Sequence, residues 1–221
     1  MRNHVYVFDL DETLINGDCA MIWNQFLVNK EVITTPDFLK EDRRLMTLYA
    51  QGKLDMAQYL NFAMSPLLTM PIKQIEQLVD ECLDNCILPM LFPEAERLIT
   101  QLKQQQSDTL IVSASVSFIV KKVAQRLGIN DALAIDLQCK QGYYLPDIEG
   151  IATYREGKVT RLKQWLHLNH KSDAHITFYT DSINDLSMCL HADDVVLINP
   201  CSQLKEAANN YPQWTICAWG Q

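Results

Sequence analysis

The chain has 221 residues, of which 48% are hydrophobic and 21% are charged, and its formal net charge at pH 7 is −8. This is the composition of a globular protein with room for one large core and a smaller unit, which excludes disordered and collagen-like classes. The acidic balance argues against nucleic acid or an anionic membrane surface as a partner and favours a small molecule. Nothing in the sequence indicates an oligomeric state.

The cysteines and the apolar segments predict a soluble, cytoplasmic protein. The seven cysteines are scattered and lack the paired spacing of a zinc site, so we expect reduced thiols in the core. The N-terminal residues do not match a secretory signal, and no apolar stretch approaches the length of a membrane span.

The first predicted element is a strand over residues 5–8, an unbroken run of β-branched and aromatic side chains. Such a run is typical of a central parallel strand that is covered on both faces. Asp9 and Asp11 follow at once. Because ligands of these sheets bind beyond the carboxyl ends of the strands, both carboxylates are candidates for a reactive site.

The region from about residue 18 to residue 86 shows only helical signals. Asp18 and Asp55 suit helix N-caps, and Pro71 suits a first helical turn. Over residues 72–83 apolar side chains recur at steps of three and four, which predicts an amphipathic helix. We therefore expect an all-helical cap over residues 17–86, inserted into an α/β core formed by residues 1–16 and 87–221.

From residue 93 onward helix and strand signals alternate, which predicts a Rossmann-like, doubly wound parallel sheet. A small hairpin is expected within residues 141–157, where glycine and proline punctuate short extended runs. Helices are expected from residues 93, 158 and 183 and over 120–127. Strands are expected at residues 109–112, 132–137, 175–179 and 195–198. The cap would lie over the active edge of this sheet as a lid.

Polar groups that can support phosphoryl transfer stand where this pattern places strand ends. A carboxylate nucleophile, Asp9, is followed two residues later by a proton donor, Asp11. Ser113 and Lys158 can hold an anion. The remaining carboxyl groups are Asp181 and Asp185. Four clustered carboxylates would repel one another unless a divalent cation neutralised them, and all-oxygen ligation suits Mg²⁺.

Each of these residues also has a purely structural interpretation. Ser113 alone suits a helix N-cap, Lys158 alone a solvated first turn, and Asp181 with Asp185 an N-cap followed by a first-turn acid. A calcium loop is disfavoured because Leu14 stands where that loop needs Gly. Their joint occurrence in this order favours the catalytic interpretation.

Four stretches of the chain resemble the motifs of the haloacid dehalogenase superfamily of phosphohydrolases. They are residues 8–14 (FDLDETL), 112–113 (VS), 157–158 (GK) and 179–185 (YTDSIND). The resemblance spans nearly the whole chain and is greatest to the phosphoserine-phosphatase-like branch, subfamily IB, which includes histidinol-phosphate phosphatases. It implies a Rossmann-like core and a helical type 1 cap.

The resemblance also implies a role for each site residue. Asp9 would be the nucleophile and a metal ligand, and Asp11 the acid/base and, through its backbone carbonyl, a second Mg²⁺ contact. Asp181 would be a further metal ligand, which Asp185 would support. The residues that would hold the phosphoryl group are Ser113 and Lys158.

The substrate is expected to be a small, amine-bearing phosphate monoester similar to phosphoserine or histidinol phosphate. Asp18 lies where phosphoserine phosphatases carry a Glu that meets the substrate ammonium, although it also suits an N-cap. Arg43 or Arg44 could bind a substrate carboxylate, or could simply lie on an exposed helix face. Phosphotransfer to a metabolite hydroxyl is an alternative reaction, and a catalytically silent binding module is an alternative of another class.

Overall fold

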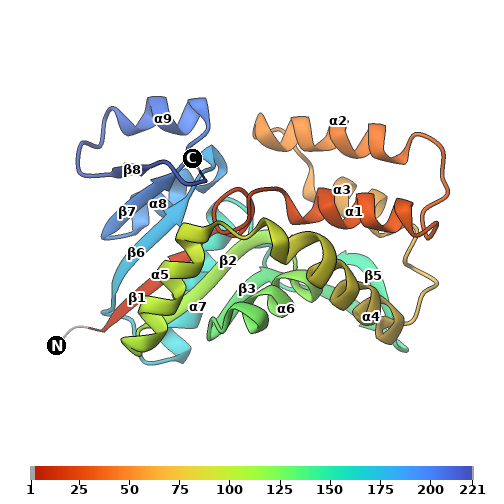
Figure 1. The fold of residues 1–221 in the computed structure, drawn as a ribbon, viewed down its shortest axis with the longest axis horizontal. Coiled ribbons are helices and arrows are strands. Elements are labelled where there is room, and N and C mark those ends of the chain that lie inside the picture. Colours follow the sequence, from red (N-terminus) through yellow and green to blue (C-terminus); the bar gives the residue numbers. More distant parts are fainter. Residues whose placement is uncertain (1–2, 221) are drawn as a thin grey trace.

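The computed structural model describes residues 3–220, and within them a parallel sheet forms the centre of the fold (Figure 1). Its strand order is β3-β2-β1-β6-β7-β8. The strands are β1 (His4–Phe8), β2 (Asp108–Val116), β3 (Asp131–Ile135), β6 (His175–Thr180), β7 (Asp194–Ile198) and β8 (Thr215–Cys217). The predicted doubly wound α/β architecture is confirmed.

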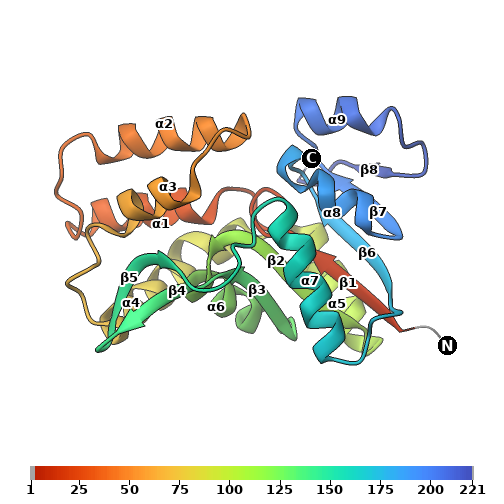
Figure 2. The ribbon, with the colours of Figure 1, turned by 180° about the vertical axis from the view of Figure 1, so that it is seen from behind.

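Strand β1 is central because it pairs in parallel with both β2 and β6. Its side chains alternate between two apolar clusters, with Val5 and Val7 in one and Phe8 in the other. The helices of the core are α5 (Pro93–Gln104), α6 (Ser117–Leu127), α7 (Glu156–Leu168), α8 (Leu186–His191) and α9 (Ser202–Ala208). Helices α5 and α6 cover one face of the sheet, and α7 and α8 cover the other (Figure 2).

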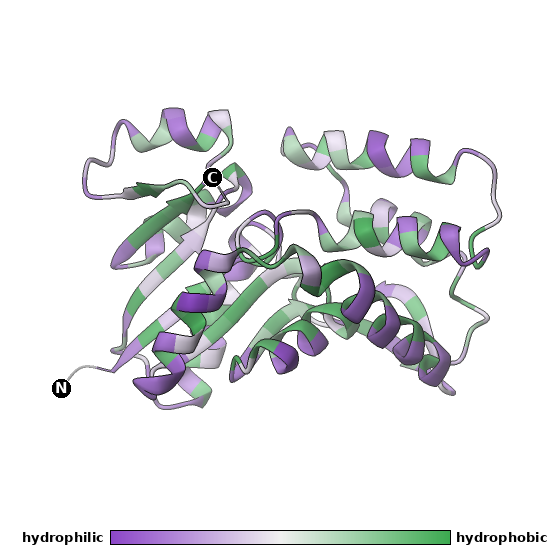
Figure 3. Ribbon diagram, viewed as in Figure 1, coloured by the Kyte–Doolittle hydropathy of each residue, from purple (hydrophilic) through white to green (hydrophobic). Residues whose placement is uncertain are grey.

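A group of helices separates β1 from β2, as the sequence predicts. They are α1 (Cys19–Asn29), α2 (Phe38–Ala50), α3 (Met56–Met64) and α4 (Ile72–Cys82). The side chains of Asp18 and Asp55 cap α1 and α3 by accepting backbone N–H bonds. Figure 1 shows α2 farthest from the sheet, and Figure 3 shows mixed hydropathy on these helices against the largely hydrophobic strands.

The α4 end of this helical region is tied to the core. Helix α4 continues through a π-helical turn (Leu83–Ile87) and a 3₁₀ turn (Leu88–Met90) toward α5. The Lys122 ammonium on α6 lies 2.5 Å from the Asp80 carboxylate on α4, and Arg126 pairs with Asp84.

The hairpin and the strand before it differ from the prediction. The apolar run at residues 132–137 is not one strand, because β3 ends at Ile135 and the chain leaves the sheet at Asp136, whose carboxylate binds Lys121 and Arg161. The antiparallel hairpin consists of β4 (Leu137–Lys140) and β5 (Tyr143–Ile148), so it starts before the predicted residues 141–157.

Other differences concern short or polar segments. The expectation that Ser113 ends a strand is wrong, because strand β2 continues to Val116. The stretch Ser113–Ala114–Ser115 has small and polar side chains but is still extended.

The seven thiols are free, but only Cys19, Cys82 and Cys189 are buried in the core as expected. Cys139 is exposed on β4, and the other three thiols are partly buried. No helix within residues 3–220 has the length and apolar character that crossing a bilayer requires.

Candidate active site

The predicted site residues converge at the carboxyl ends of β1, β2 and β6. Asp9 directly follows β1, and its backbone N–H donates to the Tyr179 carbonyl of β6 at 2.9 Å. Asp181 is the first residue after β6, and Ser113 lies on the neighbouring strand β2. This is the edge at which open parallel sheets bind ligands.

Lys158 is the electrostatic centre of the site. Its side chain reaches from the first turn of α7 and is only 1% exposed, which excludes the interpretation as a solvated lysine. The ammonium lies 2.9 Å from Asp9 Oδ1 and 2.7 Å from Asp185 Oδ1, and Thr180 donates its hydroxyl to Asp185 Oδ2 at 2.8 Å. Burial lowers the pKa of Lys158, but the carboxylates of Asp185 and Asp9 raise it above its ordinary value, so the ammonium stays charged.

The carboxyl groups around Lys158 are crowded. Burial raises the pKa of Asp9 to about 7, with Lys158 opposing the shift and Asp185 and Asp11 adding to it. Burial also raises the pKa of Asp181 well above its ordinary value, and the charges of Asp9 and Asp185 add to this effect. One lysine therefore does not neutralise the group, and the remaining negative charge favours a cation.

The donor set fits a hard divalent cation that keeps part of its water shell. Among residues 3–220, no group of three or more His, Cys, Asp or Glu side chains is arranged to enclose a metal ion. Mg²⁺ does not need such a cage, because it commonly binds through one or two carboxylates together with waters and phosphate oxygens. The excess of buried carboxylates near Asp9 and Asp181 suits this mode of binding.

Asp11 is held in place by both the core and α1. The backbone N–H of Cys19 donates to Asp11 Oδ1 at 2.7 Å, and the hydroxyls of Ser115 and Ser113 donate to Asp11 Oδ2 at 2.8 and 3.3 Å. Ser113 is not a helix N-cap, because α6 begins only at Ser117. Sequence reasoning missed Ser115, although residues two apart on a strand share a face and the Ser-Ala-Ser pattern could have indicated it.

An apolar pocket runs from Asp11 and Ser115 into the helical region. Its other lining side chains are Asp18, Ala20, Trp23, Asn24, Met46, Tyr49, Leu54, Met56, Tyr59, Leu60, Ala63, Met64, Ala114, Val116, Phe118 and Ile119. Apolar side chains with a few polar groups are typical of small-molecule sites. The lining contains aspartates but no lysine or arginine, so the pocket suits a neutral or cationic ligand group better than a carboxylate.

Asp18 is one of the lining residues of this pocket and has two structural roles. It is the N-cap of α1, since its carboxylate accepts the Met21 N–H at 2.8 Å, and it also lines the pocket. Burial raises the pKa of Asp18 to about 8, and the nearby Asp11 charge adds to the shift. A cation in the pocket would favour the ionised form.

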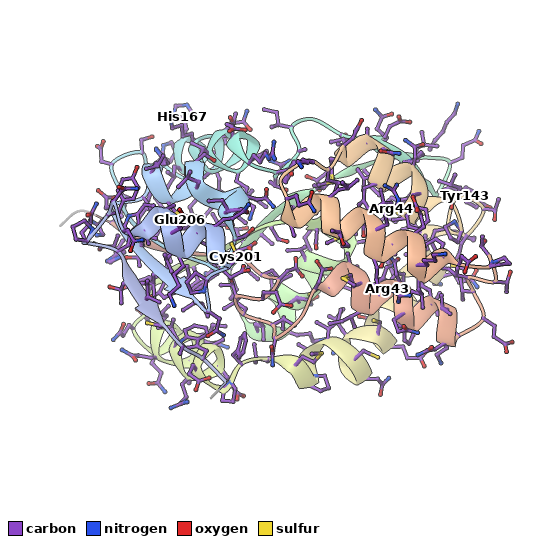
Figure 4. The ribbon with its side chains drawn as sticks, turned by 90° about the horizontal axis from the view of Figure 1, so that it is seen from above. Arg43, Arg44, Tyr143, His167, Cys201 and Glu206 are labelled. Carbon is purple, nitrogen blue, oxygen red and sulfur yellow. The ribbon has the colours of Figure 1, made fainter. Side chains whose placement is uncertain are left out.

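Arg43 and Arg44 lie outside the pocket. Both are exposed on α2, where Arg44 forms a bidentate pair with Glu41, and neither lines the cavity (Figure 4). Their structural interpretation as an exposed helix face therefore holds.

A second set of contacts joins the core to the end of α2 and was not predicted. The Asn184 side-chain amide donates to the Tyr49 carbonyl at 3.0 Å, and the Arg155 guanidinium donates to the Gly52 carbonyl. The rings of Tyr49 and Tyr154 stack with centroids 5.5 Å apart. These contacts join residues more than 100 positions apart, and they hold the helical region against the site.

Comparison with known proteins identifies the family. A family model described as haloacid dehalogenase-like hydrolase matches residues 6–189, and the chain belongs to this family. Its expected class, a phosphoric monoester hydrolase, is confirmed by this membership together with the phosphatases among its relatives.

The relatives and structural neighbours are similar over nearly their full lengths. A histidinol-phosphatase of Neisseria meningitidis is 29% identical over 94% of this chain and 95% of its own. A phosphoserine phosphatase of Methanocaldococcus jannaschii is 24% identical over 94% of this chain and 91% of its own. Among solved structures, a protein of unknown function from Bordetella pertussis has a TM-score of 0.87, 26% identity and 98% coverage of both chains. A phosphoserine phosphatase that carries a phospho-aspartyl intermediate analogue has a TM-score of 0.69, 24% identity and coverage of 99% of this chain and 94% of its own, which supports the same fold.

Proposed function

We propose that this protein is a Mg²⁺-dependent phosphomonoesterase that acts through an aspartyl-phosphate on Asp9. The observation that carries the proposal is the buried ammonium of Lys158 at 2.9 Å from Asp9, which orients one carboxylate oxygen and can stabilise the phosphoryl charge. An Asp9 oxygen would attack phosphorus, and the bond from phosphorus to the leaving alcohol oxygen would break.

Asp11 would serve as the acid and then the base of the reaction. It would give its proton to the departing oxygen, and in the second half it would take a proton from the water that attacks the aspartyl-phosphate. The bonds from Cys19, Ser113 and Ser115 fix its position at the pocket mouth. The second step releases inorganic phosphate and restores Asp9.

The residues proposed to hold Mg²⁺ are Asp9, the Asp11 backbone carbonyl and Asp181, with Asp185 in support. Bound Mg²⁺ would neutralise charge on the phosphoryl oxygens and on the attacking carboxylate. Ser113 and Lys158 are proposed to bind the phosphoryl group. Lys158 also links Asp9 to Asp185, so the two carboxylates are positioned by one cation.

The substrate is proposed to be a small amine-bearing metabolite of the histidinol-phosphate type rather than phosphoserine. Asp18 in the pocket lining supports an ammonium, whereas the absence of lysine and arginine from the described lining disfavours a substrate carboxylate. The apolar and aromatic side chains of the pocket lining support a leaving group larger than serine. The similarity to the Neisseria histidinol-phosphatase points the same way.

The helical region, residues 17–86, is proposed to act as a lid on a core of residues 1–16 and 87–221. The contacts of Tyr49 and Gly52 with the core support this role, because they close the region over the site and exclude water. We also propose a cytoplasmic location, which the free thiols support.

A phosphate-release screen tests the proposed reaction. With Mg²⁺, the protein should release inorganic phosphate from L-histidinol phosphate faster than from L-phosphoserine or sugar phosphates, without an added acceptor. Exhaustive chelation should reduce the rate at least about a hundredfold, and added Mg²⁺ should restore it. Turnover that survives chelation would contradict the Mg²⁺ role, and turnover only with an acceptor alcohol would indicate a phosphotransferase.

Replacement of Asp18 by Asn should weaken recognition of the amine. We expect KM for L-histidinol phosphate to rise about tenfold while p-nitrophenyl phosphate, which lacks an amine, changes less than about twofold. Burial raises the pKa of Asp18 to about 8, so without substrate the Asp18 carboxyl is largely protonated below that pH. The preference for the amine-bearing substrate over p-nitrophenyl phosphate should therefore grow between pH 6 and pH 8. Steady-state kinetics at several pH values measure both effects.

The same variant contains the control for this pH dependence. In Asp18→Asn the preference for the amine-bearing substrate should no longer change with pH over this range. Equal losses on both substrates would instead assign Asp18 only its capping role on α1.

A further inference from the structure

Three polar side chains are buried close together in the helical region, at the pocket. Asn24 on α1 is 1% exposed, Asp42 on α2 is 1% exposed and Tyr59 on α3 is 7% exposed. Asn24 and Tyr59 line the pocket, and Asp42 is hydrogen-bonded to Asn24 without lining the pocket itself. The surrounding lining is apolar, so these groups stand out as the polar features of this region.

The bond between Asn24 and Asp42 fixes the orientation of the amide. Asn24 Nδ2 donates to Asp42 Oδ1 at 2.9 Å. An ionised carboxylate only accepts hydrogen bonds, so the amide must turn its NH₂ group toward Asp42. The Asn24 carbonyl oxygen is then the group that Asn24 can offer to a donor in the pocket.

Tyr59 supplies a second polar group, which lies close enough to Asp42 to oppose the rise that burial causes in the pKa of that carboxyl. Its hydroxyl is buried and has no partner in hydrogen-bonding geometry among the described residues. A buried hydroxyl without a partner destabilises the fold, whereas phenylalanine would fill the same space without that cost. The neighbouring Asp42 does not satisfy this hydroxyl in good geometry, so the hydroxyl is available to a ligand in the pocket that it lines.

The spacing along α1 places this polar group well beyond Asp18. Asn24 is six residues after Asp18, which corresponds to roughly 9 Å along a helix axis. Trp23 and Phe118 also line the pocket, with their ring centroids 6.1 Å apart in an edge-to-face arrangement. A planar ring with an N–H donor fits both the aromatic walls and the acceptor.

We propose that Asn24 and Tyr59 determine specificity by binding a nitrogen heterocycle on the leaving group, with Asp42 as the positioning residue for Asn24. This inference rests on the proposed function, in which Asp18 meets the ammonium of the same substrate. The ring N–H donates to the Asn24 carbonyl, and the Tyr59 hydroxyl bonds a second ring nitrogen. The ligand class is a phosphorylated amino alcohol that carries an imidazole-like ring.

Tyr59→Phe tests the proposal because it removes only the hydroxyl. We expect KM for L-histidinol phosphate to rise about tenfold with kcat nearly unchanged, while O-phosphoethanolamine, which has the amine but no ring, is unaffected. The melting temperature should stay the same or rise, since an unpaired buried hydroxyl is lost. Tyr211→Phe is the matched control, because Tyr211 stacks on Trp214 outside the pocket lining and the loss of its hydroxyl should change the kinetics of neither substrate.

Asp42→Asn tests the positioning role of Asp42. The new amide can donate as well as accept, so it no longer forces the Asn24 side chain to point its NH₂ group at residue 42. KM should rise several-fold for the ring-bearing substrate alone. The proposal would be overturned if Tyr59→Phe left KM for L-histidinol phosphate unchanged. It would also be overturned if the variant lost equal activity on both substrates and had a lower melting temperature.

Binding of the dephosphorylated product separates this inference from the proposed reaction. Calorimetry with L-histidinol should show about tenfold weaker binding to Tyr59→Phe than to the unaltered protein, whether or not phosphate is released. If the protein did not release phosphate but still bound L-histidinol more tightly than Tyr59→Phe does, the proposed reaction would be rejected and the proposed subsite would be supported. Equal binding by both proteins would reject the subsite.

Discussion

Replacement of Asp9 by Asn is expected to abolish phosphate release while the protein stays folded. The amide cannot form the aspartyl-phosphate, so kcat for L-histidinol phosphate should fall at least about a thousandfold. Lys158 keeps its partner Asp185 at 2.7 Å, so the variant does not leave the buried ammonium unpaired. Steady-state kinetics and thermal unfolding measure the two parts of this prediction.

The matched control is Asp147→Asn on the exposed part of β5. It makes the same chemical change at a distance from the site and should leave kcat and KM as they are. Near-normal activity in Asp9→Asn would mean that another group attacks phosphorus. A large drop in melting temperature would mean that Asp9 acts mainly in folding.

Replacement of Lys158 by Met is expected to remove both activity and much of the stability. The change leaves Asp9, Asp181 and Asp185 close together without a cation, and breaking a buried ion pair in this way costs about 3–5 kcal/mol. Phosphate release should also fall by at least about a hundredfold, because the phosphoryl charge loses its fixed counter-charge. Denaturant unfolding without Mg²⁺ gives the free energy of unfolding, and kinetics with Mg²⁺ give the activity.

Lys171→Met provides the comparison for stability. Lys171 lies 2.6 Å from Asp108, and its side chain is 21% exposed. Pairs in contact with solvent contribute about 0–1 kcal/mol, so this variant should unfold close to the unaltered protein. If both lysine variants lost the same small amount, the Asp9, Lys158 and Asp185 cluster would not have the role assigned to it.

Much of the sheet and the site could be predicted from local sequence patterns. The apolar run before Asp9 predicts a central strand, and parallel strands bring their carboxyl ends together, which explains why Asp9 and Asp181 meet although 172 positions separate them in the chain. The caps at Asp18 and Asp55 depend on a side chain and the next helical turn, so they too are visible in the sequence.

The contacts between distant elements could not be predicted in this way. The bonds from Asn184 to the Tyr49 carbonyl and from Arg155 to the Gly52 carbonyl use backbone acceptors, which any residue type supplies. No local pattern indicates such a partner. The small, polar stretch at Ser113 and Ser115 likewise reads as a strand end, and only pairing with β3 extends the strand to Val116.

Trapping of the phosphorylated enzyme tests the central claim most directly. A radiolabelled phosphate monoester that the enzyme turns over should, after rapid denaturation, leave a label that is stable in acid, is released by hydroxylamine and maps to the peptide containing Asp9. The account predicts this label in the unaltered protein and its absence in Asp9→Asn. A label on another residue, or turnover without any trapped label under single-turnover conditions, would contradict it.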